Sequence, residues 1–130
     1  MSHKLNRVKV KLPYPVRVGL FYIDLKKNVG FSFDNMAVFL LKENLGLKDS
    51  SELKQWIEKK SANELMIEQL FAAHQSFCLW EKESSISKKR FMDGISKITK
   101  EELQKIIKVW EHSETFGVKN IPGKKKAVRN

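Results

Sequence analysis

The spacing of apolar residues changes once along this chain, near Asp34, and that change limits the folds open to it. Before Asp34, apolar residues alternate with polar ones, as at Val8, Val10 and Leu12, which is the period of a half-buried β-strand. After Asp34 they recur at the spacing of an amphipathic helix. The sequence therefore predicts an α+β fold that is mainly α. A small N-terminal antiparallel β-hairpin or sheet within residues 1–33 is followed by about five helices.

The strand region has two interruptions. Pro13 and Pro15 cannot donate to a ladder and end the first strand, and the alternation resumes at Val16. We expect a turn at Lys26-Lys27-Asn28, because Asn tolerates a positive φ, with a further strand after it. The alternative is a helix from Val16 to Lys27 that ends near Gly30, since short apolar runs fit either structure.

The helical body, residues 34–113, carries a start signal before each apolar stripe. Ser61-Ala62-Asn63-Glu64 and Thr99-Lys100-Glu101-Glu102 both match the capping box, in which hydroxyl and carboxylate satisfy free amides reciprocally. The other expected N-caps are Asp34, Asp49 and Ser87. The helix behind Ser61 is apolar nearly all round as far as Lys82, which predicts a central helix with Phe71 and Phe77 in the core.

Length and composition favour one small domain. The chain has 130 residues, so we expect a single globular domain over residues 1–113 and a basic, flexible tail over residues 114–130. No apolar run approaches the length of about 18 residues that a membrane helix needs, so we expect no membrane partner. The single cysteine, Cys78, fits a reducing cytoplasm.

The excess positive charge lies at the two ends of the chain. Residues 1–27 carry seven basic side chains and one acidic one, and residues 117–130 carry five basic side chains and no acidic one. Residues 28–116 carry 13 basic and 14 acidic side chains, a net charge of −1. DNA-binding domains usually gather cations on one folded face, so this distribution favours basic arms on a neutral body.

The residues that could carry chemistry have structural explanations. His74 and Cys78 lie four residues apart on the most apolar helix, where a free Cys behaves as a small hydrophobe. Trp56, Trp80 and Trp110 each fall on a core stripe of a different helix and are interpreted as packing residues. We therefore expect no catalytic, cofactor-binding or metal-binding residues, no cofactor and no enzymatic activity.

Two further features bear on binding. The Lys88-Lys89-Arg90 run is interpreted as a solvated helix face, with a partner carboxylate or phosphate as the alternative. The tail run Lys124-Lys125-Lys126 is interpreted as solubilising. Apolar side chains beyond a single helical stripe indicate surface that a partner helix could cover. These side chains are Met36, Leu40, Met66 and Leu79.

The order of these features resembles the tail assembly chaperones of long-tailed bacteriophages. The resemblance covers roughly residues 28–113. It rests on an aromatic-ended strand, a helix that closes in Leu45-Gly46, a short helix ending in Lys59-Lys60, the Leu70-Phe71-Ala72-Ala73-His74 helix and the Thr99 helix start. It implies a cytoplasmic protein of the infected bacterial host, without enzymatic activity, that binds the helix-rich tape-measure protein during tail morphogenesis. It also allows self-association. The alternative function is a small basic protein that binds nucleic acid through its terminal arms.

Overall fold

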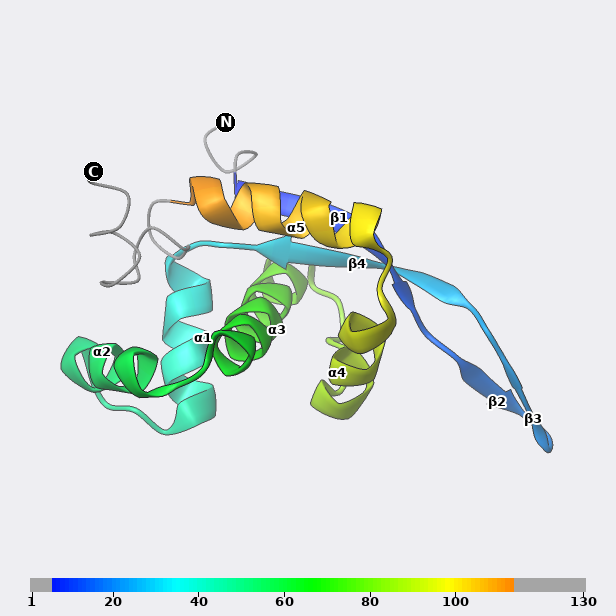
Figure 1. Ribbon diagram of the computed structural model, residues 1–130, viewed down its shortest axis with the longest axis horizontal. Helices are drawn as coiled ribbons and strands as arrows, with labels where there is room; N and C mark the ends of the chain where they lie inside the picture. Colours follow the sequence, from blue (N-terminus) through cyan, green and yellow to red (C-terminus); the bar gives the residue numbers. More distant parts are fainter. Residues whose placement is uncertain (1–5, 114–130) are drawn as a thin grey trace.

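The computed structural model describes residues 6–113, which form an α+β fold that is mainly α, as predicted. The four strands are β1 (Arg7–Pro13), β2 (Val16–Val18), β3 (Phe21–Ile23) and β4 (Lys26–Ser32). The five helices are α1 (Asn35–Leu45), α2 (Ser50–Lys59), α3 (Ala62–Glu81), α4 (Lys88–Lys97) and α5 (Lys100–His112). Figure 1 shows the strands as one long ribbon, with the helices gathered at one end and β2 and β3 beyond them. The predicted basic tail, residues 114–130, lies outside the described residues.

The four strands are one β-hairpin of constant register. Strand β1 pairs with β4 from Arg7 opposite Ser32 to Pro13 opposite Lys26, and β2 pairs with β3 from Val16 opposite Ile23 to Val18 opposite Phe21. Residues 14–15 separate β1 from β2, and residues 24–25 separate β3 from β4. Because both gaps have two residues, the register is the same in both strand pairs and there is no β-bulge between them. In this gap the amide of Tyr14 donates to the carbonyl of Leu25 over 2.7 Å. We call residues 7–32 the ribbon.

The predicted turn at Lys26-Lys27-Asn28 is wrong, and so is the alternative helix from Val16 to Lys27. Residues 26–28 lie inside β4, and the chain reverses instead at Gly19-Leu20, between two strands that pair up to the turn. Gly19 has a φ of +63°, which suits the first position of a two-residue type II′ turn. Apolar and polar residues alternate on both sides of this two-residue turn, and this pattern favours a β-hairpin over a helix.

All five helices begin where the sequence predicts, each with a side chain that accepts from a free amide. Asp34, Asp49, Ser61, Ser87 and Thr99 are the observed N-caps. Ser61 and Glu64 form the complete capping box. At Thr99 only half of the predicted box forms, because the carboxylate of Glu102 accepts instead from the backbone amide of Lys11 over 2.8 Å.

Within residues 6–113 no further strand pairs with the ribbon, and side chains of helices meet both of its edges at the base. The Glu102 carboxylate of α5 takes the free amide of Lys11 on the β1 edge. On the β4 edge, the Nδ1 of His74 in α3 lies 3.0 Å from the carbonyl of Gly30. Unpaired strand edges invite association with other chains, and side chains from α5 and α3 meet the edges here.

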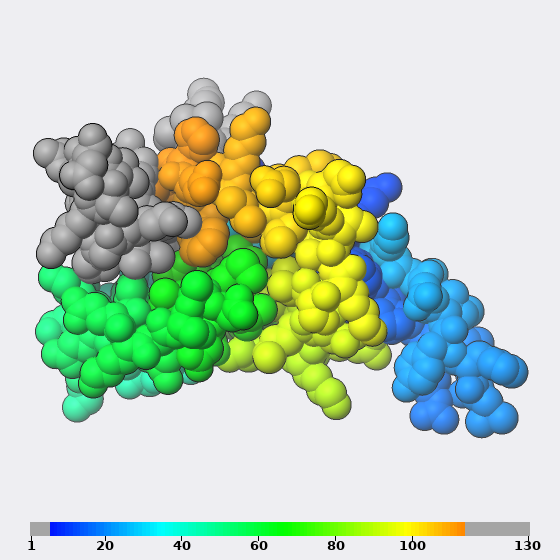
Figure 2. All heavy atoms as spheres, in the orientation of Figure 1, coloured from blue at the N-terminus to red at the C-terminus, as the bar shows by residue number. Residues whose placement is uncertain are grey.

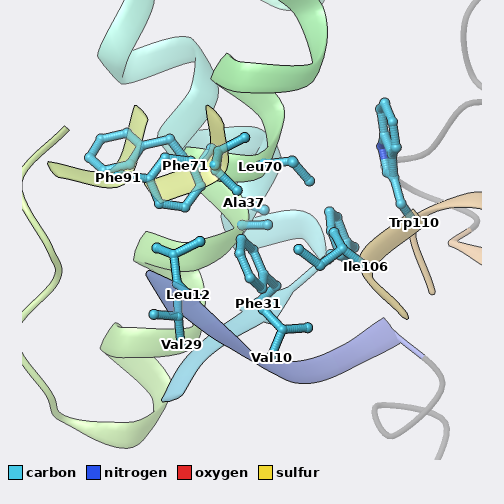
Figure 3. Packing of buried hydrophobic residues seen from close by; sticks show 14 of the residues in the cluster. Val10, Leu12, Val29, Phe31, Ala37, Leu70, Phe71, Phe91, Ile106 and Trp110 are labelled. Carbon is cyan, nitrogen blue, oxygen red and sulfur yellow. The ribbon is translucent and has the colours of Figure 1, made fainter. Parts of the chain in front are cut away.

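The core lies between the ribbon and the helices. Figure 3 shows Val10, Leu12, Val29 and Phe31 of the ribbon meeting side chains of α3, α4 and α5. The aromatic ring of Phe31 lies 5.9 Å from that of Phe91, within the range of favourable ring contacts. Phe71 and Phe77 are both buried, as predicted, at 7% and 6% exposure.

Gly30 gives a direct test of this packing. A Cβ at this position would lie 2.3 Å from the Phe77 ring, which the Arg7 guanidinium covers from 4.9 Å. We expect Gly30→Ala to lower the free energy of unfolding by about 1–3 kcal/mol through overpacking. Denaturant unfolding of the single variant and of Gly30→Ala/Phe77→Leu measures this, and the smaller second side chain should recover part of the loss. An unchanged stability of Gly30→Ala would contradict the packing described.

Candidate functional site

The structure brings His74 and Cys78 together but holds both in neutral form. The Cys78 sulfur lies 3.6 Å from the Nε2 of His74. That Nε2 accepts from the backbone amide of Ile86 over 3.1 Å, and Nδ1 faces the carbonyl of Gly30, which can only accept. The imidazole is therefore the Nδ1–H tautomer, with both nitrogens engaged in bonds between α3, β4 and the segment before α4.

The electrostatics of this pair oppose nucleophilic chemistry. Burial lowers the pKa of His74, and burial raises the pKa of the Cys78 thiol. A thiolate paired with an imidazolium needs both shifts in the opposite direction. Over residues 6–113, no group of three His, Cys, Asp or Glu side chains is placed to hold a metal ion.

The ribbon has one apolar face along almost its whole length, which we call the inner face. Successive side chains of a strand alternate between faces, so a constant register assigns every residue to one of them. The inner face carries Val8, Val10, Leu12, Tyr14, Val16, Val18, Phe21, Ile23, Leu25, Lys27, Val29 and Phe31. The opposite face, which we call the outer face, is polar or basic over most of its length, including Arg7, Lys9, Lys11, Arg17 and Asp24.

Burial of the inner face stops abruptly along the ribbon. At the base, Val10, Leu12, Val29 and Phe31 are 0–2% exposed. Beyond Tyr14, the exposure of Val18 is 53%, that of Phe21 76%, that of Ile23 46% and that of Leu25 48%. We call residues 14–25 the arm. Its main contacts are between its own two strands, and it stands out from one end of the helical body (Figures 1 and 2).

The base of the arm is fixed to the body by Tyr14 and Arg90. The Arg90 guanidinium donates to the carbonyl of Pro15 over 2.7 Å and lies 4.9 Å from the centre of the Tyr14 ring. The ammonium of Lys27 lies 5.1 Å from the same ring. Cations over an aromatic ring are stabilising, so Tyr14 is held where the covered and uncovered parts of the inner face meet.

The sequence predicted that the Lys88-Lys89-Arg90 run is a solvated helix face. In the structure two of its three side chains make specific contacts. Lys88 pairs with the carboxylate of Glu68 over 2.6 Å, and Arg90 holds the arm. Beside this contact lies a hollow of about 660 Å³. It is lined by Pro15, Tyr22, Lys89, Arg90, Met92 and Asp93.

A second hollow, of about 430 Å³, lies beside the N-terminus of α1 and is lined by Arg7, Asp34, Trp80 and three neighbouring residues. The Asp34 carboxylate accepts from the hydroxyls of Ser32 and Ser76, the amide of Ala37 and the indole of Trp80. These four donors come from β4, α1 and α3, so Asp34 ties three elements together. A carboxylate so fully engaged is suited to structure rather than to proton transfer.

Several packing predictions differ from the structure. Trp80 is 60% exposed because its indole nitrogen reaches Asp34 at the surface, whereas Trp110 is buried and Trp56 is partly buried. Of the four side chains expected to leave apolar surface, Met36 and Leu79 are exposed. Leu40 and Met66 pack against the core.

The sequence patterns described above do not single out the arm. Its signal was present in the alternation that continues past Pro15 on both sides of Gly19. The segment Lys26-Lys27-Asn28, which resembles a turn, obscured it. Alternation identifies an apolar face but not whether helices later in the chain reach it, so exposure required the tertiary structure.

Comparisons of the chain with protein-family models, curated protein sequences and solved structures gave no match. Within residues 6–113, none of the helices combines the length and apolar character needed to cross a membrane. The candidate site therefore stands on its own geometry: an apolar arm attached to a firmly packed base.

The buried neutral His74 predicts a pH dependence of stability. Burial lowers its pKa in the folded state, so below about pH 6.5 the unfolded chain binds a proton that the folded chain resists. Stability should therefore fall as the pH drops below about 6.5. Glu64 and Glu102 act only at lower pH, because hydrogen bonds from Ser61 and Lys11 lower their pKa values.

Urea unfolding at stepped pH measures this slope. His74→Gln should flatten it, while His112→Gln, which alters an exposed histidine of α5, serves as the matched control and should keep it. Equal slopes in wild type and His74→Gln would show that His74 is not the group responsible.

Proposed function

We propose that this protein is a non-enzymatic assembly chaperone of the phage-tail type, which binds a helix-rich tape-measure protein during tail morphogenesis. The observation that carries the proposal is the arm, on which a core-like apolar face is left uncovered. Contiguous apolar surface of this kind on a folded domain is typical of interaction sites.

The resemblance in residues 28–113 supports the same function. The segments on which it rests are the end of β4, α1 with its Gly46 cap, α2, α3 and the start of α5. Gly46 adopts a φ of +69° and ends α1 in the left-handed conformation. The resemblance therefore rests on regular elements and their caps.

The chemistry of such a client suits the arm. A long helical chain that has not yet assembled exposes apolar stripes, which aggregate unless another apolar surface covers them. Basic side chains at the N-terminal end of the chain would attract acidic stretches of the client by long-range steering. The proposal places both partners in the cytoplasm of the bacterial host, where the client is synthesised.

Co-expression with the client tests the function. The large open reading frame next to this gene should encode a long helical protein, and this chain should raise its soluble yield and co-purify with it. An unrelated coiled coil of similar length is the control and should gain nothing. A neighbouring helical product whose solubility is indifferent to this chain would refute the proposal.

Binding of nucleic acid is the second candidate, favoured by the exposed Lys9 and Lys11 on the outer face of β1. The described residues offer cations for phosphates but no helix or strand with side chains arranged to read bases.

We expect binding of duplex DNA only at low salt. Phosphate contacts release counterions, so affinity should collapse by about 0.15 M salt. Fluorescence anisotropy with two unrelated 20-base-pair duplexes measures this. Sequence-selective binding that persists at about 0.15 M salt would favour the nucleic-acid function over the chaperone.

A further inference from the structure

The inner face of the ribbon is apolar both at the base and on the arm, but within residues 6–113 helices cover it only at the base. Val10 and Leu12 at the base are buried under helices, while Val18 and Phe21 on the arm occupy equivalent positions of the same face and meet solvent. The alternation that buries one half is thus repeated on the other half. A face of this kind fits a cover of the same type as the one over the base.

The cover over the base is helical. Strand β1 packs on α5 and α4, and β4 packs on α3, each of which turns an apolar stripe to the ribbon (Figure 3). The exposed inner face of the arm is long enough to contact a short helix. Residues 14–18 span roughly 17 Å as an extended strand, which matches about three turns of an α-helix.

The charge around the arm indicates which residues should flank the apolar stripe of a helix bound there. Six exposed basic side chains and two exposed acidic ones surround the arm and its base. They are Lys11, Arg17, Lys26, Lys27, Lys89 and Arg90, against Asp24 and Asp93. Of these, Lys27 lies on the inner face and Arg90 contacts Tyr14 on that face. Asp93 is already paired with Lys97 over 3.4 Å. A partner with acidic residues beside its apolar stripe complements this rim.

We propose that the inner face of the arm docks an amphipathic helix of the client whose apolar stripe is flanked by acidic residues. This inference rests on the proposed function and adds the chemistry of the segment that is bound. The helix lies across Val18, Phe21 and Ile23 as α5 lies across the base. Its carboxylates meet Lys27 and Arg90, whose cations lie beside Tyr14 on the same face.

Other occupants fit the arm less well. Two copies that pack arm against arm would bring their basic rims together, and like charges oppose such a contact. Nucleic acid is bound by stacking on aromatic platforms, whereas the inner face of the arm is mainly aliphatic. A membrane-inserting tip is apolar on both faces, but here Arg17 and Tyr22 lie opposite each other on the outer face.

Binding of synthetic peptides to the full chain tests the docking chemistry. The probe is a fluorescein-labelled 21-residue amphipathic helix with a leucine stripe flanked by glutamates. One control keeps the stripe with lysine flanks, and the other keeps the composition but scrambles the stripe. In fluorescence anisotropy the glutamate peptide should bind at least about 10-fold more tightly than either control. Equal binding of all three, or no binding, would overturn the inference.

Variants of the arm locate the binding face. Val18→Ser/Phe21→Ser should weaken binding of the glutamate peptide at least about 10-fold. Tyr22→Ser, which removes a ring of similar exposure from the outer face, should leave it within about twofold. Lys27→Glu, which reverses a charge on the inner face, should weaken binding of the glutamate peptide and strengthen binding of the lysine peptide. Circular dichroism and the thermal midpoint check that each variant folds, and a Tyr22→Ser loss equal to that of the inner-face variant would overturn the assignment.

Three further measurements separate the inference from its rivals and from the proposed function. Sedimentation showing a dimer that Val18→Ser/Phe21→Ser dissociates would assign the arm to a second copy instead. Flotation with vesicles of anionic phospholipid, lost in the same variant, would assign it to a membrane. Undiminished solubilisation of the client by this variant would refute the arm as the docking site and leave the chaperone function standing.

Discussion

The ribbon of residues 7–32 is apolar along one face, and the burial of that face organises the rest of the molecule. Side-chain alternation in a constant register places a continuous row of valine, leucine, isoleucine and phenylalanine side chains on this face. A two-stranded sheet is marginal in water unless something packs on it. Helices α3, α4 and α5 supply that cover at the base, whereas Val18, Phe21 and Ile23 on the inner face of the arm are exposed.

The edges of the ribbon impose the second constraint. Strand amides and carbonyls that leave water need partners, and here single side chains from helices provide them. Glu102 leaves its expected place in the capping box of α5 to accept from Lys11, and His74 stays neutral to bridge Gly30 and Ile86. His74 and Cys78 have the spacing of a reactive pair in the sequence. In the structure, His74 instead serves as a hydrogen-bond partner for two backbone groups.

Much of the fold could be predicted from the sequence because its signals are local. Each N-cap from Asp34 to Thr99 depends on one side chain and the next turn, and all five are where the sequence places them. The predicted turn at residues 26–28 failed because residues that favour turns also tolerate an exposed strand. The exposure of Trp80 and the partners of His74 depend on residues at least 12 positions away, and no local pattern encodes them.

The contact between β1 and α5 joins the first and last elements of the described chain, with Lys11 and Glu102 separated by 91 positions. During synthesis the ribbon leaves the ribosome before the helix that covers its first strand is made, and the other four helices are made in between. The inner face and the β1 edge thus remain open while the helices between are being translated, a period in which exposed strands are prone to aggregate. Completion of the fold is tied to a long-range closure, so folding should be slower than in a helical bundle of equal size.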